Sequence, residues 1–315
     1  MANNTNICIE IYLKKTKMVL TILKKTQAKL KLRKAGLPFL FIIITGTFSF
    51  ISCSDDNKKA ALEYSGTAVD LGTHKLMTYT VLDKSKYLVV FESGHGNDHT
   101  SWYSTGQSSE ILSIAHFLDS DVLLYDRAGY GKSGVSTAPR NINTLRSELE
   151  KVVDQFAQGR KIILVGHSLG GVIIRDYAIK NPAKVAGLVF VDASHEKYNH
   201  FSQDQIDGFY NTYKNTYGAN SGIALETLQL IADFKYAATL PNLPDVPVIA
   251  LTSMKTDAEH DAADRKLWYD SKEALKAGVT DFTHIATVNS GHFIQLEEPE
   301  LVLGNIKALL AKLPL

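Results

Sequence analysis

A serine between two glycines, placed where an apolar run meets a helical pattern, restricts the fold more than any other feature of this chain. Residues 161–165 read K-I-I-L-V, and G-H-S-L-G follows at residues 166–170. This order predicts a short buried strand, a tight turn and a helix. The turn projects the serine hydroxyl out of the sheet beside the helix N-terminus, and glycines avoid the collisions that larger side chains would cause there. We therefore interpret Ser168 as a candidate nucleophile.

A serine hydroxyl needs a base that removes its proton and an acid that orients that base. Near the C-terminus, residues 282–288 read as a strand and are followed by a loop that contains His292. A helix is predicted from about Glu298 to Leu310. The position of His292 just after the last strand makes it the predicted base, whereas His284 lies within the strand pattern and is interpreted as structural.

Two aspartates are candidates for the acid. Asp257 follows a predicted strand at residues 246–251, in a loop that holds three further acidic residues. Asp192 ends another predicted strand, at residues 185–191. The expected order Ser, Asp or Glu, His favours Asp257. Asp192 is kept as the alternative acid.

Catalysis at a carbonyl also requires N–H groups that bind the oxyanion. One predicted donor is the backbone N–H of Leu169, directly after the serine. The other is the backbone N–H of Asn97, in a glycine-containing loop at residues 92–97, which follows a predicted strand and in which His95 shapes the backbone. A metal pair formed by His95 and His99 lacks a third ligand at a zinc-like spacing. We expect neither a metal nor a cofactor.

Three motifs in this order resemble the α/β-hydrolase fold superfamily. The loop at residues 92–96, followed by Trp102, looks like the oxyanion loop of that family, and Y-D-R-A-G-Y-G-K-S at residues 125–133 is similar to its D-R-x-G-x-G-x-S turn. The serine motif at residues 166–171 and then His292 complete the pattern. The resemblance implies an α/β fold with a mostly parallel central sheet and helices on both faces.

The resemblance also implies the roles of the site residues. Ser168 would be the nucleophile, His292 the base, Asp257 the acid, and Asn97 and Leu169 the oxyanion donors. One departure concerns the acid, because Thr-Ser-Met rather than a glycine-containing turn follows the strand before Asp257.

A single domain is predicted for residues 66–315, with one helical insertion. Strand signals alternate with helix signals, such as an opening hairpin at residues 67–82 and an amphipathic helix at residues 143–156. From about residue 194 to 244 there is no strand pattern. Aromatic residues at 198–217 and apolar positions at 225, 228, 231 and 234 suggest helices there. We interpret this segment as a cap, inserted between the strands that end near Asp192 and Leu251.

The N-terminus differs in charge and composition from the rest. Residues 1–52 contain nine Lys or Arg and one Glu, which gives +8, and subtracting this from the whole-chain charge of +1 leaves −7 for residues 53–315. A mildly acidic body lacks the usual electrostatic support for nucleic-acid binding.

Basic residues followed by an apolar run from Leu37 to Ile51 form the pattern of a signal peptide. Met18 is a possible start. The sequence Ser52-Cys53 resembles a bacterial lipoprotein cleavage site, and the Ser-Asp-Asp after it is similar to the surface-export signal of Bacteroidetes lipoproteins. These features predict a signal peptide at residues 1–52, lipidation of Cys53, and a tether at residues 53–65. The protein would then be lipid-anchored at the outer membrane or cell surface of a Gram-negative bacterium, with secretion or a periplasmic location as the alternative.

The combined pattern predicts a serine hydrolase that cleaves an ester or related acyl bond of a small molecule through an acyl-enzyme. Acyl transfer, C–C or peptide-bond cleavage by the same triad is the first alternative, and a non-catalytic surface binding protein is the second. The sequence indicates neither the acyl chain nor an oligomeric state.

Overall fold

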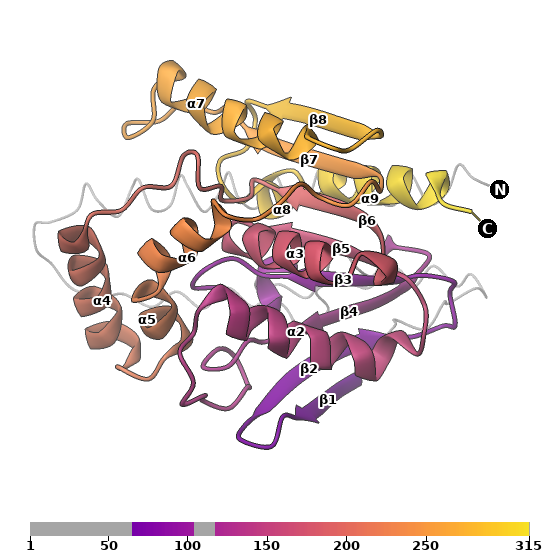
Figure 1. Cartoon of the computed structure of the whole chain (residues 1–315), viewed down its shortest axis with the longest axis horizontal. Helices are drawn as coiled ribbons and strands as arrows, with labels where there is room; N and C mark the ends of the chain where they lie inside the picture. Colours follow the sequence, from indigo (N-terminus) through magenta and orange to yellow (C-terminus); the bar gives the residue numbers. More distant parts are fainter. Residues whose placement is uncertain (1–64, 104–116, 315) are drawn as a thin grey trace, which may run out of the picture. The chain divides into compact units, whose positions relative to one another are not determined.

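The computed structural model describes residues 65–103 and 117–314. Within them, eight strands form one sheet in the order β1-β2-β4-β3-β5-β6-β7-β8 (Figure 1). The predicted hairpin is confirmed as the antiparallel pair β1 (Ser65–Asp70) and β2 (Lys75–Val81). β2 also pairs antiparallel with β4 (Asp121–Tyr125), and every later pairing in the sheet is parallel. The other strands are β3 (Leu88–Glu92), β5 (Ile162–His167), β6 (Val185–Val191), β7 (Val248–Ser253) and β8 (Phe282–Thr287).

Central strands are buried on both faces, which explains why they read as continuous apolar runs. Along β3, the side chain of Val90 packs in one apolar layer and that of Val89 in the other. α2 (Ile142–Ala157) and α3 (Leu169–Lys180) contribute to the first layer. α9 (Pro299–Lys312) contributes to the second. The predicted α/β fold, with helices on both faces of a mostly parallel sheet, is confirmed.

The bounds of two predicted elements shift for local reasons. β7 begins at Val248 rather than at residue 246, because Pro247 has no N–H to contribute to the ladder, and Val248 N–H instead donates to Asp281 O at 2.9 Å. α2 begins one residue earlier than predicted, at Ile142, because the Asn141 side chain caps it by accepting the Thr144 N–H at 3.0 Å.

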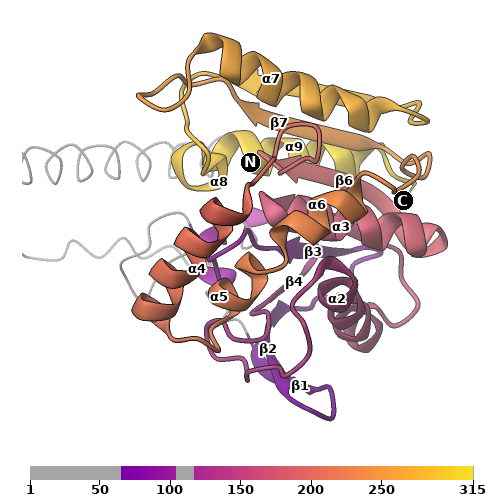
Figure 2. The same cartoon turned by 60° about the vertical axis from the view of Figure 1, so that its left-hand side comes forward.

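The segment between β6 and β7 forms the predicted helical cap. It contains α4 (Gln203–Tyr217), α5 (Gly222–Thr227) and α6 (Leu230–Ala237). These helices are grouped together beside the sheet (Figure 2). One helix expected from positions 225–234 is in fact two, α5 and α6. Leu228, which the apolar spacing placed on the packed stripe, is 43% exposed at the break between them.

The remaining described elements are η1 (His99–Trp102), η3 (Pro182–Lys184), α7 (Ala262–Glu273), η4 (Ala274–Lys276) and α8 (Ile294–Glu297). None of the helices in the described residues is long and apolar enough to cross a bilayer. The predicted signal peptide, the lipidation residue Cys53 and the tether before Ser65 lie outside the described residues.

Candidate active site

Ser168 lies between β5 and α3 in a backbone conformation that side-chain-bearing residues rarely adopt, with φ 52° and ψ −123°. The flanking glycines make this turn possible. A Cβ on Gly170 would lie 2.4 Å from Glu92 O, and one on Gly171 would lie 2.3 Å from Ala193 Cβ. The predicted strand, tight turn and helix are confirmed. The hydroxyl of Ser168 stands at the N-terminus of α3, 3.5 Å from Ser194 Oγ.

His292 is held by a buried carboxylate on the neighbouring strand end. Its Nδ1 lies 2.7 Å from Oδ2 of Asp192, whose side chain is fully buried at the end of β6. The other oxygen of Asp192 accepts the Ser253 N–H at 2.8 Å and the Trp268 Nε1–H at 2.7 Å. Burial alone would raise the pKa of Asp192, but the His292 contact and the other donors hold that pKa below its ordinary value. Asp192 is therefore an ionised partner that fixes the orientation of His292.

Asp257, the acid favoured by the sequence, does not contact His292. Its Oδ1 accepts the backbone N–H groups of Glu259 and His260, each at 2.9 Å, and its Oδ2 accepts from Arg265 Nη2 at 3.1 Å. The Glu259 N–H, with the His260 contacts, lowers the pKa of Asp257 to about 2. Asp257 lies four residues beyond the end of β7, so its carboxylate stabilises its own loop, whereas Asp192 follows β6 directly. The geometry thus brings Asp192, the alternative acid, rather than Asp257 into contact with His292.

His292 is also in contact with His167. His167 donates its Nε2–H to the backbone carbonyl of His292 at 2.9 Å, and the two rings are 4.7 Å apart. Burial, followed by the charge on His292, lowers the pKa of His167 to about 3. His167 is therefore neutral at physiological pH and serves as a support. His284, interpreted from sequence as structural, stacks on Tyr269 with ring centroids 3.9 Å apart.

In the loop after β3, His95 rather than Asn97 lines the pocket with Ser168. The Asn97 N–H donates to Gly94 O at 3.3 Å and its side-chain amide to His95 O at 3.1 Å, so both groups serve the loop itself. His95 lines the pocket that contains Ser168 and Leu169. No acceptor for the His95 backbone N–H occurs among residues 65–103 and 117–314. The first glycine of G-H-G is the sequence signal for the His95 N–H as a candidate donor. A Cβ on Gly94 would lie 3.0 Å from Ser168 Cβ, so this part of the loop packs on the serine turn.

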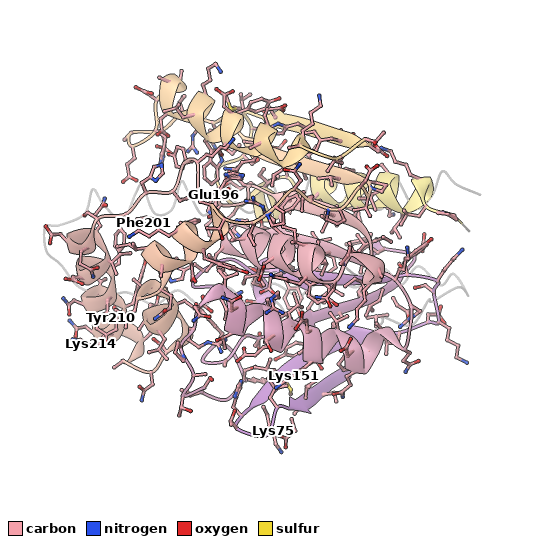
Figure 3. The ribbon with its side chains drawn as sticks, in the orientation of Figure 1. Lys75, Lys151, Glu196, Phe201, Tyr210 and Lys214 are labelled. Carbon is pink, nitrogen blue, oxygen red and sulfur yellow. The ribbon has the colours of Figure 1, made fainter. Side chains whose placement is uncertain are left out.

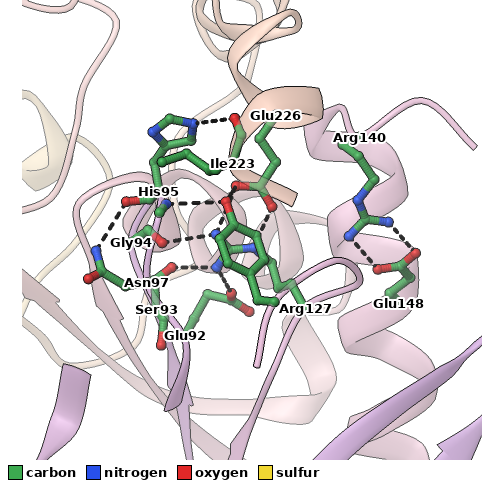
Figure 4. A network of polar contacts seen from close by, with 12 residues as sticks. Glu92, Ser93, Gly94, His95, Asn97, Arg127, Arg140, Glu148, Ile223 and Glu226 are labelled. Atoms are coloured by element: carbon green, nitrogen blue, oxygen red, sulfur yellow. Dashed lines mark hydrogen bonds and ion pairs between the residues drawn. The ribbon is translucent and has the colours of Figure 1, made fainter. Parts of the chain in front are cut away.

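A buried arginine holds this loop in place (Figure 4). Arg127, from the D-R-A-G turn, donates to Ser93 O at 2.6 Å and to Gly94 O at 2.9 Å. Its charge is balanced by Glu92 at 2.8 Å and by Glu226 of α5, which accepts two hydrogen bonds at 2.8 and 2.9 Å. Burial raises the pKa of Glu92 to about 7, while for Glu226 burial is outweighed by Arg127 and the pKa is lowered. The sequence identified the motif around Arg127 but assigned it no role.

His95 connects the same loop to the cap. Its Nε2 lies 3.1 Å from Ile223 O and 3.0 Å from Thr227 Oγ1, both in α5. Burial lowers the pKa of the His95 side chain, so the ring is neutral at physiological pH. The loop after β3 is therefore attached to the cap both through Arg127 and through His95.

The elements described above enclose a pocket of about 370 Å³. The cap lines it with apolar side chains, among them Phe201, Leu230 and Phe234, while polar groups from the loop after β7 and from α7 line it elsewhere. The full lining consists of His95, Ser168, Leu169, Ser194, Tyr198, Asn199, Phe201, Leu230, Phe234, Asp257, His260, Arg265, Trp268 and His292. A pocket with an apolar wall and a few polar groups suits a small organic substrate.

Three ionisable groups outside this pocket come close enough to hold a cation: Asp98, His99 and Asp126, with potential ligand atoms within 4.8 Å of one another. Several atoms of these groups take part in hydrogen bonds within the protein. Asp126 Oδ1 lies 2.6 Å from His99 Nδ1, and Asp98 Oδ1 accepts the Thr100 N–H at 2.9 Å. These hydrogen bonds stabilise the turn that contains Asp98 and His99, and His95 is directed elsewhere, toward the cap.

Known proteins resemble this chain in sequence and in fold. Residues 87–228 match the alpha/beta hydrolase fold family. The uncharacterized protein YbdG of Bacillus subtilis is 30% identical over 137 residues, which are 43% of this chain and 40% of that protein. Protein phosphatase methylesterase 1 of Candida albicans is 30% identical over 128 residues, which are 39% of this chain and 34% of that protein. The matched region thus spans two fifths or less of these curated relatives.

Among solved structures, a thermophilic esterase from Thermogutta terrifontis is similar with a TM-score of 0.60, at 17% identity, covering 79% of this chain and 98% of that chain. A likeness at this identity concerns the fold. Taken with the sheet order, it shows that the described residues have the alpha/beta hydrolase fold, and residues 87–228 match the family of that name.

Proposed function

We propose that this protein is a serine hydrolase that cleaves an ester or related acyl bond of a small molecule. The observation that carries the proposal is the convergence of Ser168 and His292 on one pocket, with His292 Nδ1 bound to the buried carboxylate of Asp192. A base fixed in this way keeps Nε2 available to accept the proton of a serine hydroxyl. Esterases among the relatives support the same assignment.

In the proposed reaction, Ser168 Oγ attacks the acyl carbon while its proton passes to His292 Nε2. The backbone N–H groups of Leu169 and His95 bind the oxyanion of the tetrahedral intermediate, and each such donor contributes about 3 kcal/mol in comparable enzymes. The C–O bond to the leaving alcohol then breaks as His292 returns the proton to that oxygen. Water, deprotonated by His292, hydrolyses the acyl-enzyme by the same steps.

Two measurements test this proposal. A fluorophosphonate probe should label the protein, and peptide mapping should place the label on Ser168 rather than on neighbouring Ser194. Ser168→Ala should abolish both labelling and the hydrolysis of 4-nitrophenyl butyrate, while Ser194→Ala should still be labelled. Turnover by folded Ser168→Ala at the wild-type rate would show that another group performs the chemistry.

We also propose that the protein works outside the cytoplasm on a lipid anchor at Cys53. Support comes from the sequence alone, namely the basic and apolar segments followed by Ser52-Cys53. Radiolabelled palmitate should be incorporated into the full chain in a Gram-negative bacterial host and not into Cys53→Ala. Incorporation into Cys53→Ala at the wild-type level would contradict the anchor.

A further inference from the structure

Arg265 is a buried arginine in the wall of the Ser168 pocket whose hydrogen bonds are mostly unmade. The residue is 6% exposed and lies in the first turns of α7. Nη2 donates to Asp257 Oδ2 at 3.1 Å. Nε is buried without a hydrogen-bond partner, and Nη1 has no acceptor among the described residues either. A guanidinium carries five N–H groups, so most of its donor capacity faces no protein acceptor.

Two other buried arginines, Arg127 and Arg140, donate more hydrogen bonds to protein acceptors than Arg265 does. Arg127 uses all three nitrogens on two carboxylates and two backbone carbonyls. Arg140 directs both Nη atoms to the two oxygens of Glu148, so that only its Nε is buried without a partner. Leaving a buried charged donor unpaired costs more than leaving a neutral one. The deficit at Arg265 therefore points to an acceptor that binds from the pocket.

Asp257 does not remove this deficit. Its Oδ1 is committed to the backbone N–H groups of the loop that it stabilises, and its carboxylate is half exposed, so it reaches Arg265 through one oxygen only. The ion pair with Asp257 uses Nη2 and leaves the N–H groups of Nε and Nη1 for a ligand. A single positive charge beside one aspartate suits a monoanion better than a dianion.

We propose that Arg265 binds a carboxylate at the end of the substrate's acyl chain, so that the pocket selects acyl compounds with an anionic end. This rests on the proposed hydrolase function and adds the substrate class. The planar guanidinium matches a carboxylate, which it can bind through two parallel hydrogen bonds. Phe201, Leu230 and Phe234 form the apolar wall that would contact the methylene groups of such a chain. Phe201, which precedes α4, is labelled in Figure 3.

The kinetic test compares pairs of 4-nitrophenyl esters that differ only in charge. Mono-esters of glutaric, adipic and suberic acid are each paired with a branched alkanoate in which two methyl groups replace the carboxylate oxygens. Wild-type protein should favour the best anionic ester in kcat/KM by about 10- to 100-fold, the range expected for a hydrogen-bonded charge pair. Arg265→Gln should remove this preference. Lys266→Gln, which removes a charge from the neighbouring exposed position of α7, should keep it.

A binding measurement decides the case independently of catalysis. Titration calorimetry with glutarate, adipate and suberate should show binding to the wild type and to Lys266→Gln, and at least tenfold weaker binding to Arg265→Gln. Inorganic phosphate should not compete. Absent diacid binding, binding that survives Arg265→Gln, or stronger binding of phosphate would overturn the proposal. Diacid binding without Ser168-dependent hydrolysis would refute the hydrolase function and leave the carboxylate site standing.

Discussion

The carboxylate of Asp192 lies 2.7 Å from Nδ1 of His292, although 100 residues separate the two in the chain. The sheet brings them together. β5, which ends beside Ser168, pairs in parallel with β6, which ends beside Asp192, and parallel strands present their carboxyl ends at one edge. The loop after β8 then brings His292 to that edge.

Replacing Asp192 by Asn should lower kcat for 4-nitrophenyl butyrate by about 10³- to 10⁴-fold, because the amide no longer stabilises the His292 tautomer and cation that the reaction needs. Asp257→Asn should have a much smaller effect, since Asp257 contacts its own loop and Arg265. Steady-state kinetics of both variants, with circular dichroism to verify folding, compares them. A severe loss of kcat in Asp257→Asn with a mild loss in Asp192→Asn would instead identify Asp257 as the acid.

Most of the fold could be predicted from the sequence because the buried parallel strands contain continuous apolar runs, such as residues 88–91 and 162–165, and several of them are followed by a turn motif. The choice of acid could not, because two aspartates both follow strands. What separates them is spacing: Asp192 comes directly after β6, whereas Asp257 comes four residues after β7. The break between α5 and α6 at Leu228 could not be predicted for a different reason, because the spacing of apolar residues alone does not show which of them are packed.

Arg127 and Arg140 are both buried in ion pairs, but of the two only Arg127 binds the loop after β3, which holds the proposed oxyanion donor His95. Replacing either by Met should destabilise the protein by about 3–5 kcal/mol, because buried carboxylates lose their partner. In the fraction that remains folded at low temperature, Arg127→Met should lower kcat, and Arg140→Met should retain the wild-type value. Urea denaturation and active-site titration with a fluorophosphonate separate stability from activity. Equal kcat values in the two variants would exclude a positioning role for Arg127.

Neither the contacts of Arg127 nor the position of the proposed second oxyanion donor could be predicted from the sequence, and the reason is the same. Both depend on contacts between the loop after β3 and α5, which lie about 130 residues apart. A glycine-rich loop indicates that backbone approaches a substrate, but which N–H remains free depends on internal turns such as Asn97 to Gly94. Such local hydrogen bonds leave no pattern in residue types.

Asp233 of α6 should make stability depend on pH. Burial raises its pKa from 3.8 to about 7, although its Oδ1 accepts the Ile142 N–H at 3.0 Å. The folded state therefore keeps a proton that the unfolded chain releases, and stability is lost as pH rises from about 4 through about 7. Asp233→Asn retains an acceptor oxygen without the charge. The difference in unfolding free energy between this variant and the wild type should therefore shift in favour of the variant as the pH rises from about 4 through about 7. Urea titrations at pH 4, 5.5, 7 and 8 measure the difference, and a constant offset across the series would contradict the shift.

Two glycines should respond to alanine in opposite directions. Gly208 lies inside α4 with no atom within 4 Å of the position of a Cβ, so Gly208→Ala should stabilise the protein by about 0.5–1 kcal/mol through helix propensity.

At Gly170 the added Cβ would lie 2.4 Å from Glu92 O and 2.7 Å from Ser93 O, which are backbone atoms of the loop beside the serine turn. Gly170→Ala should therefore destabilise by about 1–3 kcal/mol and lower kcat as that loop shifts. Midpoints of urea unfolding, measured with kcat, test both, and a stable and fully active Gly170→Ala would contradict the close approach of Gly170 to Glu92 O.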